Sequence, residues 1–298
     1  MTAKQRGMID QILRNAPFDL GGDVAVQRPL LEQMLTAHPL PADVRTTADE
    51  VGGVPVIFID IDGVVPRGTI FFAHGGGFAL GSARGSVGLA SDLARKTGMR
   101  AVSVDYRLAP EHPYPAALQD VSAAYRALLE QAGGAEHIVV AGESAGGNLA
   151  IELLIAGKPE GLAMPAAALL LSPMTDLTVS GSSYAAKAGA DPAISAQAIR
   201  TRVRDYLDGT GTPATDPLVS PVFADLTGLP PLLIQAGSHE VLLDDATSLA
   251  VKAAADDVAV VLDITPGVPH VFQAFAAALE EGNAALDRAA RFISDNLA

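Results

Sequence analysis

The chain has 298 residues, of which 49% are hydrophobic and 18% are charged, and its formal net charge is −14. Such an acidic chain is a poor partner for nucleic acid or for an anionic membrane surface, and no apolar stretch approaches the roughly 18–20 residues of a membrane span. The absence of cysteine excludes disulfides, a thiol nucleophile and a thiolate metal site. Because no signal-type hydrophobic region follows the start, we expect a cytoplasmic protein.

Two segments lack the pattern of a sheet protein and are predicted to form a cap. Residues 1–45 show amphipathic helical patterns and end in the proline-rich stretch His38–Pro41. Residues 174–215 hold polar turns and a helical stretch but no strand pattern. We expect both segments to cover the edge of a sheet, which leaves residues 46–173 and 216–298 as the two parts of the main domain.

The rest of the chain alternates between apolar runs typical of buried strands and patterns typical of helices. The predicted strands are Val54–Ile61, Thr69–Ala73, Ala101–Tyr106, Ile138–Ala141, Ala167–Leu171, Leu232–Ala236 and Val258–Ile264. The predicted helices are Gly85–Thr97, Pro115–Gln131, Ala145–Ala156, Ser195–Leu207, Leu243–Ala255, Val271–Leu279 and Asn283–Asn296. The alternation predicts an α/β fold with a mostly parallel central sheet flanked by helices. In such sheets ligands bind at the carboxyl ends of the strands.

A glycine-rich motif, His74-Gly75-Gly76-Gly77, follows the predicted strand Thr69–Ala73. Consecutive glycines leave backbone N–H groups uncovered, so these groups can stabilise the negative oxygen of a tetrahedral acyl intermediate. A flexible turn would give the same residues, whereas a phosphate loop is disfavoured because no Gly-Lys-Ser/Thr follows. A nucleophile further along the chain would decide between these interpretations.

Such a nucleophile is predicted at Ser144, within Gly142-Glu143-Ser144-Ala145-Gly146. The motif joins an apolar strand to a helix. Gly142 and Gly146 lack side chains where strand and helix must nearly touch, so the turn can be tight enough to expose the serine oxygen. A turn of small residues without chemistry would fit this string alone. Both glycine motifs together, in this order, indicate a serine hydrolase.

The serine requires a base, and His270 is the predicted one. In α/β-hydrolases the acid and the histidine follow the nucleophile in that order. Only His239 and His270 follow Ser144, and only His270 leaves room for an acid-bearing strand end in between. His74 is interpreted as a brace of the glycine loop.

The acid is expected in the loop after the predicted strand Leu232–Ala236. Glu240 lies on the loop itself and is the predicted partner of His270, because a carboxylate there would fix the tautomer of the imidazole. Asp244 is the alternative acid. Asp245 is expected to face solvent near the start of the following helix, where negative charge is favoured.

With these residues placed, the chain resembles the hormone-sensitive-lipase-like (bacterial family IV) branch of the α/β-hydrolases over residues 46–298. The motifs that carry the resemblance are His74–Gly77, Asp105–Glu111, Pro115–Ala117, Gly142–Gly147, Asp216–Pro221 and Pro269-His270. The stretch Gly267–Phe275 is similar to that of small acetyl hydrolases and monoterpene lactone hydrolases.

The resemblance implies an α/β-hydrolase fold with a helical cap, and a serine carboxylesterase that needs no metal or organic cofactor. It implies Ser144 as nucleophile and His270 as base. It also implies backbone oxyanion donors at Gly76, Gly77 and Ala145. The family's usual acid is aspartate, so Glu240 is a departure from the pattern.

The expected substrates are esters or lactones of small apolar molecules. Short acyl chains are predicted because the aromatic content is only 5%, with no tryptophan, and the cap segments are short. Two alternatives are a receptor of the same fold that binds a ligand without hydrolysing it, and a peptidase. The receptors of this family lack the catalytic histidine, and 298 residues leave no space for the propeller domain of oligopeptidases.

A homodimer is predicted at the last strand, Val258–Ile264. This run is flat and apolar, with Asp263 as its one charge and no proline or lysine. As the final strand it should lie at the sheet edge, where pairing with a second copy about a two-fold axis would cover it. The alternative is a monomer in which the helix Asn283–Asn296 covers this edge.

Overall fold

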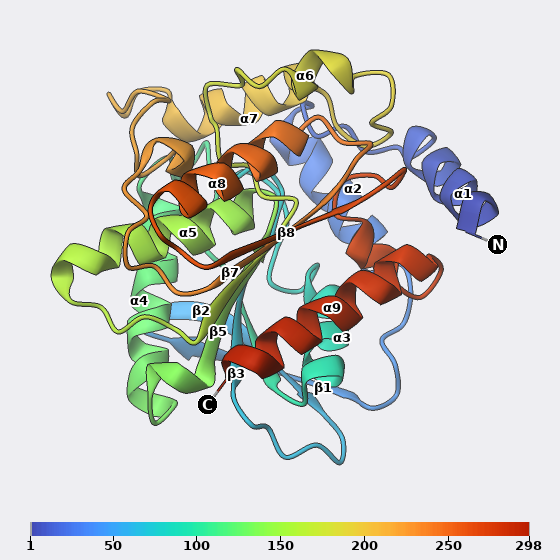
Figure 1. Cartoon of the computed structure of the whole chain (residues 1–298). Helices are drawn as coiled ribbons and strands as arrows, with labels where there is room; N and C mark the ends of the chain where they lie inside the picture. Colours follow the sequence, from blue (N-terminus) through green and yellow to red (C-terminus); the bar gives the residue numbers. More distant parts are fainter. Residues whose placement is uncertain (1, 298) are drawn as a thin grey trace.

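The computed structural model describes residues 2–297, which fold around one eight-stranded sheet (Figure 1). The strand order is β1-β2-β4-β3-β5-β6-β7-β8. The bounds are β1 Val44–Val51, β2 Val54–Ile61, β3 Thr69–Ala73, β4 Arg100–Val104, β5 Ile138–Glu143, β6 Ala167–Leu171, β7 Leu232–Gly237 and β8 Val260–Thr265. Strand β2 pairs antiparallel with β1 and β4, and all other neighbours are parallel. The predicted mostly parallel sheet is confirmed.

Every predicted strand is present. Strands β2, β3 and β6 have the bounds that their apolar runs predicted, and the others differ by one or two residues at an end. Strands β3 and β6 are buried along their whole length, as expected for parallel strands with helices on both faces. With these strand bounds, the candidate residues lie in the loops that follow the carboxyl ends of β3, β5, β7 and β8.

Strand β1 is missing from the prediction. Between its buried ends, Val44 and Val51, every residue is exposed, so the sequence shows no alternation of buried and exposed positions. The strand pairs with β2 through a turn at Gly52 and Gly53, whose φ angles are +63° and +78°. Hairpins favour two-residue turns of this kind. The sheet thus begins within the segment 1–45 that was assigned to the cap.

Helices cover both faces of the sheet. On one face lie α3 Val87–Thr97 and α9 Glu280–Asn296, and on the other lie α4 Ala116–Gln131, α5 Ala145–Gly157 and α8 Leu243–Ala255 (Figure 1). Each of these helices was predicted. The predicted helix Val271–Leu279 is reduced to a short 3₁₀ turn, Phe272–Phe275. Val271 itself precedes the turn, because its backbone is left-handed (φ +49°) and a right-handed helix cannot contain it.

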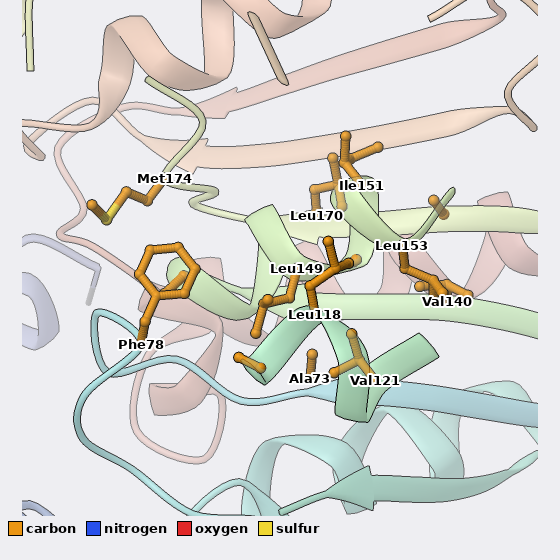
Figure 2. Close-up of a cluster of buried hydrophobic side chains, with 14 of the residues drawn as sticks. Ala73, Phe78, Leu118, Val121, Val140, Leu149, Ile151, Leu153, Leu170 and Met174 are labelled. Atoms are coloured by element: carbon orange, nitrogen blue, oxygen red, sulfur yellow. The ribbon is translucent and has the colours of Figure 1, made fainter. Parts of the chain in front are cut away.

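Helix α5 is buried on nearly all sides. One cluster of buried side chains joins α5 to α4 and to strands β5 and β6 (Figure 2); it includes Leu149, Ile151, Leu153, Leu118, Val121, Val140 and Leu170. Burying each such side chain stabilises the fold by about 1.5–3 kcal/mol. The helix is therefore held firmly, and so is the turn at its N-terminus.

The segments 1–45 and 174–215 contribute α1 Thr2–Arg14, α2 Val24–Leu35, α6 Ser183–Ala186 and α7 Ala196–Leu207. Helix α2 is fixed to the loop after β3, because Arg28 Nε donates to the carbonyl of Ala79 (2.9 Å) and the Arg28 guanidinium pairs with Glu111. Within residues 2–297, no helix combines the length and the apolar character needed to cross a membrane.

Candidate active site

Ser144 occupies a sharp turn between β5 and α5. Its φ of +54° is rare for a residue other than glycine. The flanking glycines are required by contact: a Cβ on Gly142 would lie 2.2 Å from the carbonyl oxygen of Gly146, and one on Gly146 would lie 2.1 Å from that of Ala73. The predicted close approach of strand and helix is therefore confirmed. Such a strained turn places the serine side chain beyond the carboxyl end of the strand, where its oxygen can be reached.

Glu240 and His270 form a buried pair at the ends of β7 and β8. The distance between Glu240 Oε2 and His270 Nδ1 is 2.7 Å, and Glu240 is fully buried. The other carboxylate oxygen, Oε1, accepts a hydrogen bond from the backbone N–H of Gly237 at 2.5 Å. Because a carboxylate faces Nδ1, the proton of the neutral ring lies on Nδ1 and Nε2 is left as the basic nitrogen.

Two opposing effects act on the pKa of His270. Burial of the imidazole lowers the pKa, whereas the hydrogen bond and negative charge of Glu240 raise it, and the net result is a pKa above the ordinary value. A carboxylate with this position stabilises the imidazolium that forms when a histidine takes a proton.

The other two carboxylates of the region have different roles. Asp244 accepts hydrogen bonds from the hydroxyl of Ser182 (2.7 Å) and the N–H of Ser183 (2.9 Å), so it anchors α6 and makes no contact with His270. The prediction that Asp245 faces solvent is wrong. Asp245 is 1% exposed and accepts hydrogen bonds from the N–H groups of Thr175 and Asp176, and burial raises its pKa to about 8.

The glycine loop after β3 is braced by His74, as predicted. His74 Nδ1 donates to the carbonyl of Gly75 (2.8 Å), and its ring stacks on Tyr106 at 4.1 Å. Burial of the imidazole lowers the pKa of His74, which favours the neutral ring. Gly76 and Gly77 have φ angles of +113° and +63°, values that glycine adopts readily and other residues do not.

A cavity of about 150 Å³ brings these elements together. Ser144, His270 and Gly76 line it on the side of the sheet. Apolar side chains from the first segment and from the loop before α7 also line it: Leu13, Ala16, Phe18, Leu20, Leu31, Met34, Leu35, Ala193 and Ile194. Among residues 2–297, no group of three or more His, Cys, Asp or Glu side chains is placed to hold a metal ion.

Sequence reasoning assigned no role to two carboxylates near this cavity, the partly buried Glu143 and the buried Asp191. Glu143 accepts a hydrogen bond from the N–H of Gly75 at 3.3 Å, and burial raises its pKa. Asp191 accepts from the N–H of Val241, next to Glu240, and from the N–H of Ile194. Asp191 thus ties the loop before α7 to the loop of the acid. Its sequence, Asp-Pro, is typical of a turn, which was the available signal.

Comparison with known proteins supports the same class of protein as the geometry. A family model described as "alpha/beta hydrolase fold" matches residues 70–274. An esterase from Acinetobacter venetianus is 38% identical over 265 residues, which cover 89% of this chain and 87% of that protein. An acetyl-hydrolase from Streptomyces hygroscopicus is 40% identical over 225 residues, or 76% of this chain and 75% of that protein.

A solved structure carries the likeness to the whole fold. The crystal structure of an esterase from the bacterial hormone-sensitive lipase family superposes with a TM-score of 0.94 at 37% identity, and the match covers 99% of each chain. The chain belongs to the α/β-hydrolase family, within its bacterial hormone-sensitive lipase branch. It is accordingly a carboxylic ester hydrolase.

Proposed function

We propose that this chain hydrolyses short-chain carboxylic esters or lactones through an acyl-enzyme formed on Ser144. The observation that carries the proposal is the buried pair of Glu240 and His270, 2.7 Å apart, whose histidine lines the same cavity as Ser144. A nucleophile on a strained turn, a base and an acid that orients the base are the parts that acyl transfer requires.

In the proposed mechanism, Ser144 Oγ attacks the carbonyl carbon of the ester while His270 Nε2 takes the hydroxyl proton. Glu240 stabilises the imidazolium. Collapse of the tetrahedral intermediate breaks the bond to the alkoxy oxygen, and His270 delivers its proton to the departing alcohol. Water then attacks the acyl group, gives a proton to His270 and releases the acid, after which the proton returns to Ser144.

The backbone N–H groups of Gly76, Gly77 and Ala145 are the proposed oxyanion donors. Gly76 lines the cavity, and Ala145 is the first residue of α5, where an N–H group has no partner within the helix. Gly77 packs against Arg202, since a Cβ there would lie 2.5 Å from the Arg202 Cγ. Each donor placed where negative charge develops lowers the barrier by roughly 3–4 kcal/mol.

The substrate class follows from the walls of the cavity. The segments 1–45 and 174–215 are proposed to act as the cap, because they supply most of the apolar residues that line the cavity with Ser144. A cavity of about 150 Å³ is about the size that holds a benzene molecule. Acyl groups of about two to six carbons would fill it by apolar contact without strain.

A chromogenic ester tests this proposal against the receptor alternative. The purified protein should release p-nitrophenol from the butyrate ester, whereas a receptor would bind the ester and release nothing. A fluorophosphonate probe should label one residue, located at Ser144 by peptide mass spectrometry, and Ser144→Ala should remain unlabelled. A panel of esters and lactones would then define the natural chemistry. Full inhibition by a chelator would contradict the mechanism.

We also propose a homodimer formed at β8. The strand lies at the edge of the sheet, and Val261 and Leu262 remain 49% and 39% exposed although Arg288 of α9 reaches Asp263. Light scattering should give about twice the 30.5 kDa of one chain, and Val261→Lys should halve it. Val65→Lys, a matched change at a 91% exposed valine, should not. Cytoplasmic location stays a prediction, which fractionation of expressing cells would test.

A further inference from the structure

No residue of the proposed triad follows strand β6 directly, yet β6 lies between the two strands whose following loops carry Ser144 and Glu240. In the sheet, β6 separates β5, which leads to Ser144, from β7, which leads to the loop of Glu240. The end of β6 is bonded to both neighbours. Ser144 N donates to the carbonyl of Leu171 (2.9 Å), and Ser172 N donates to that of Gln235 (2.7 Å). Ser172 therefore stands where the nucleophile strand and the acid strand meet.

The hydroxyl of Ser172 connects the acid to the loop of the base. Ser172 Oγ accepts a hydrogen bond from the N–H of Val271 at 3.0 Å and lies 3.1 Å from Glu240 Oε1. Since the N–H must donate, the hydroxyl proton is directed at the carboxylate. The side chain is fully buried, so water does not compete for either bond. One atom thus holds two loops that lie 68 and 99 positions further along the chain.

The backbone of Ser172 supports a positioning role. Its φ is +46°, and that of Val271 is +49°. A serine or valine in this region is strained and persists only where surrounding contacts hold it. The two strained residues are joined by the hydrogen bond from Val271 N to Ser172 Oγ. Because both residues of this hydrogen bond have a strained backbone, we interpret the bond as one that fixes the position of the two loops.

The carboxylate of Glu240 has donors on both oxygens. Gly237 N and Ser172 Oγ bind Oε1, which leaves Oε2 for Nδ1 of His270. A glutamate has one more rotatable bond than an aspartate and therefore loses more freedom when it is held in a single orientation. The two donors on Oε1 supply that constraint.

We infer that Ser172 is a positioning residue for ester hydrolysis, acting by fixing the carboxylate of Glu240 and the loop of His270 in register with Ser144. This inference rests on the proposed triad. Ser172 is not among the residues that line the cavity, so its loss should slow the chemical step and leave substrate binding unchanged. The hydroxyl acts through Glu240, so its effect should disappear when the Glu240–His270 pair is already disabled.

The experiment compares Ser172→Ala with Ser220→Ala in p-nitrophenyl butyrate hydrolysis. Ser220 is a matched control, because it is also fully buried and its hydroxyl likewise bridges two loops, from Leu177 N to the carbonyl of Ala214. Ser172→Ala should lower kcat by about tenfold or more, the factor for a hydrogen bond to a charged group, with KM within about twofold. Ser220→Ala should keep kcat within about twofold, and the melting temperatures of both variants show whether they are folded.

Two further variants test the route of the effect. Ser172→Gly also removes the hydroxyl but relieves the positive φ, so kcat should fall as far as in Ser172→Ala while stability recovers. In the Glu240→Gln background, Ser172→Ala should cost less than twofold. The inference is overturned if Ser172→Ala keeps kcat, if Ser172→Gly restores it, or if the losses from Ser172 and Glu240 multiply. It is separate from the proposed triad, which fails if Ser144→Ala or Glu240→Gln alone remains active.

Discussion

The cavity has two walls that the fold builds in different ways. The wall with Ser144, Gly76 and His270 consists of loops at strand ends. These loops contain residues with positive φ angles and are held in place by buried hydrogen bonds. The other wall consists of apolar side chains from α1, α2, the connection between these helices and the loop before α7. A rigid scaffold holds reacting groups in position as closely as catalysis requires, whereas apolar contacts with a substrate still form after small shifts in position. We expect changes in the first wall to alter kcat and changes in the second to alter substrate choice.

The largest effect is expected at the nucleophile. Ser144→Ala removes the atom that forms the acyl-enzyme, so kcat should fall at least about a thousandfold and by as much as ~10⁶, as for other serine hydrolases. The fold and KM should change little, because alanine has the same backbone preferences as serine at this turn. The measurement is initial-rate hydrolysis of p-nitrophenyl butyrate. Near-full activity would remove Ser144 from the mechanism.

The next largest effect is expected at the acid. Glu240→Gln keeps the size of the side chain but replaces the carboxylate that faces His270 Nδ1, and a comparable change in a serine protease costs ~10⁴ in kcat. Asp244→Asn is the matched control, because the carboxylate of Asp244 hydrogen-bonds to Ser182 and Ser183 at the start of α6. It should keep kcat within about threefold. The reverse order of damage would make Asp244 the acid.

The pH profile of the same two proteins sharpens the comparison. Only the neutral imidazole accepts the proton of Ser144, so kcat/KM falls as His270 is protonated. Because Glu240 raises the pKa of His270, the acid limb should lie above about 6.5, the ordinary value for histidine. Glu240→Gln removes the negative charge and should move the limb to lower pH. An unmoved limb would mean that another group controls it.

The two walls also differ in how far sequence reasoning reaches. Gly142 and Gly146 are needed where backbones nearly touch, so their positions predict the turn at Ser144 directly. The order of strands along the chain then leads to Glu240 and His270. Apolar cap residues such as Phe18 and Ile194 look like any helix-packing residue, since packing is decided by partners far away in sequence. Their facing the cavity could not be predicted singly.

The errors have physical causes of the same kind. The Gly52-Gly53 pair was an unused signal for the hairpin of β1 and β2, because the polar strand β1 has no apolar pattern to draw attention to it. Asp245 was expected in solvent, since acidic residues at a helix start are favoured there. Its burial depends on the N–H groups of Thr175 and Asp176, which approach from a distant loop. Sequence neighbours carry no sign of that contact.

A moderate effect is expected in the cap wall. Ala193 lines the cavity in the loop before α7, so Ala193→Phe should fill part of the space for the acyl chain. The ratio of kcat/KM for the hexanoate ester to that for the acetate ester should fall by about tenfold, in line with what one or two methylenes contribute in an apolar pocket. Ala185→Phe, at an exposed position in α6, is the control and should leave the ratio unchanged. An equal loss for both esters would place Ala193 in the chemistry rather than in selectivity.

The smallest effect is expected at Asp245, which is not among the residues that line the cavity. The carboxylate of Asp245 accepts hydrogen bonds from the N–H groups of Thr175 and Asp176, at the start of the segment 174–215. Burial raises the pKa of Asp245 to about 8. In the unfolded chain an aspartate ionises near 3.9. Between about pH 4 and pH 8 the folded protein therefore binds one proton more than the unfolded chain, and folding stability declines as the pH rises through this window.

Asparagine cannot ionise, yet its side-chain oxygen can accept the same N–H donors. Asp245→Asn should remove that decline, so the melting temperature of the variant should gain on that of the parent between pH 5 and pH 8. The gain should be several degrees, at about 2–4 °C for each kcal/mol in a domain of this size. Thermal denaturation followed by circular dichroism at both pH values measures it, and kcat for the butyrate ester should stay within about twofold. If the difference in melting temperature between the two proteins does not change with pH, Asp245 is charged in the folded protein and the explanation is wrong.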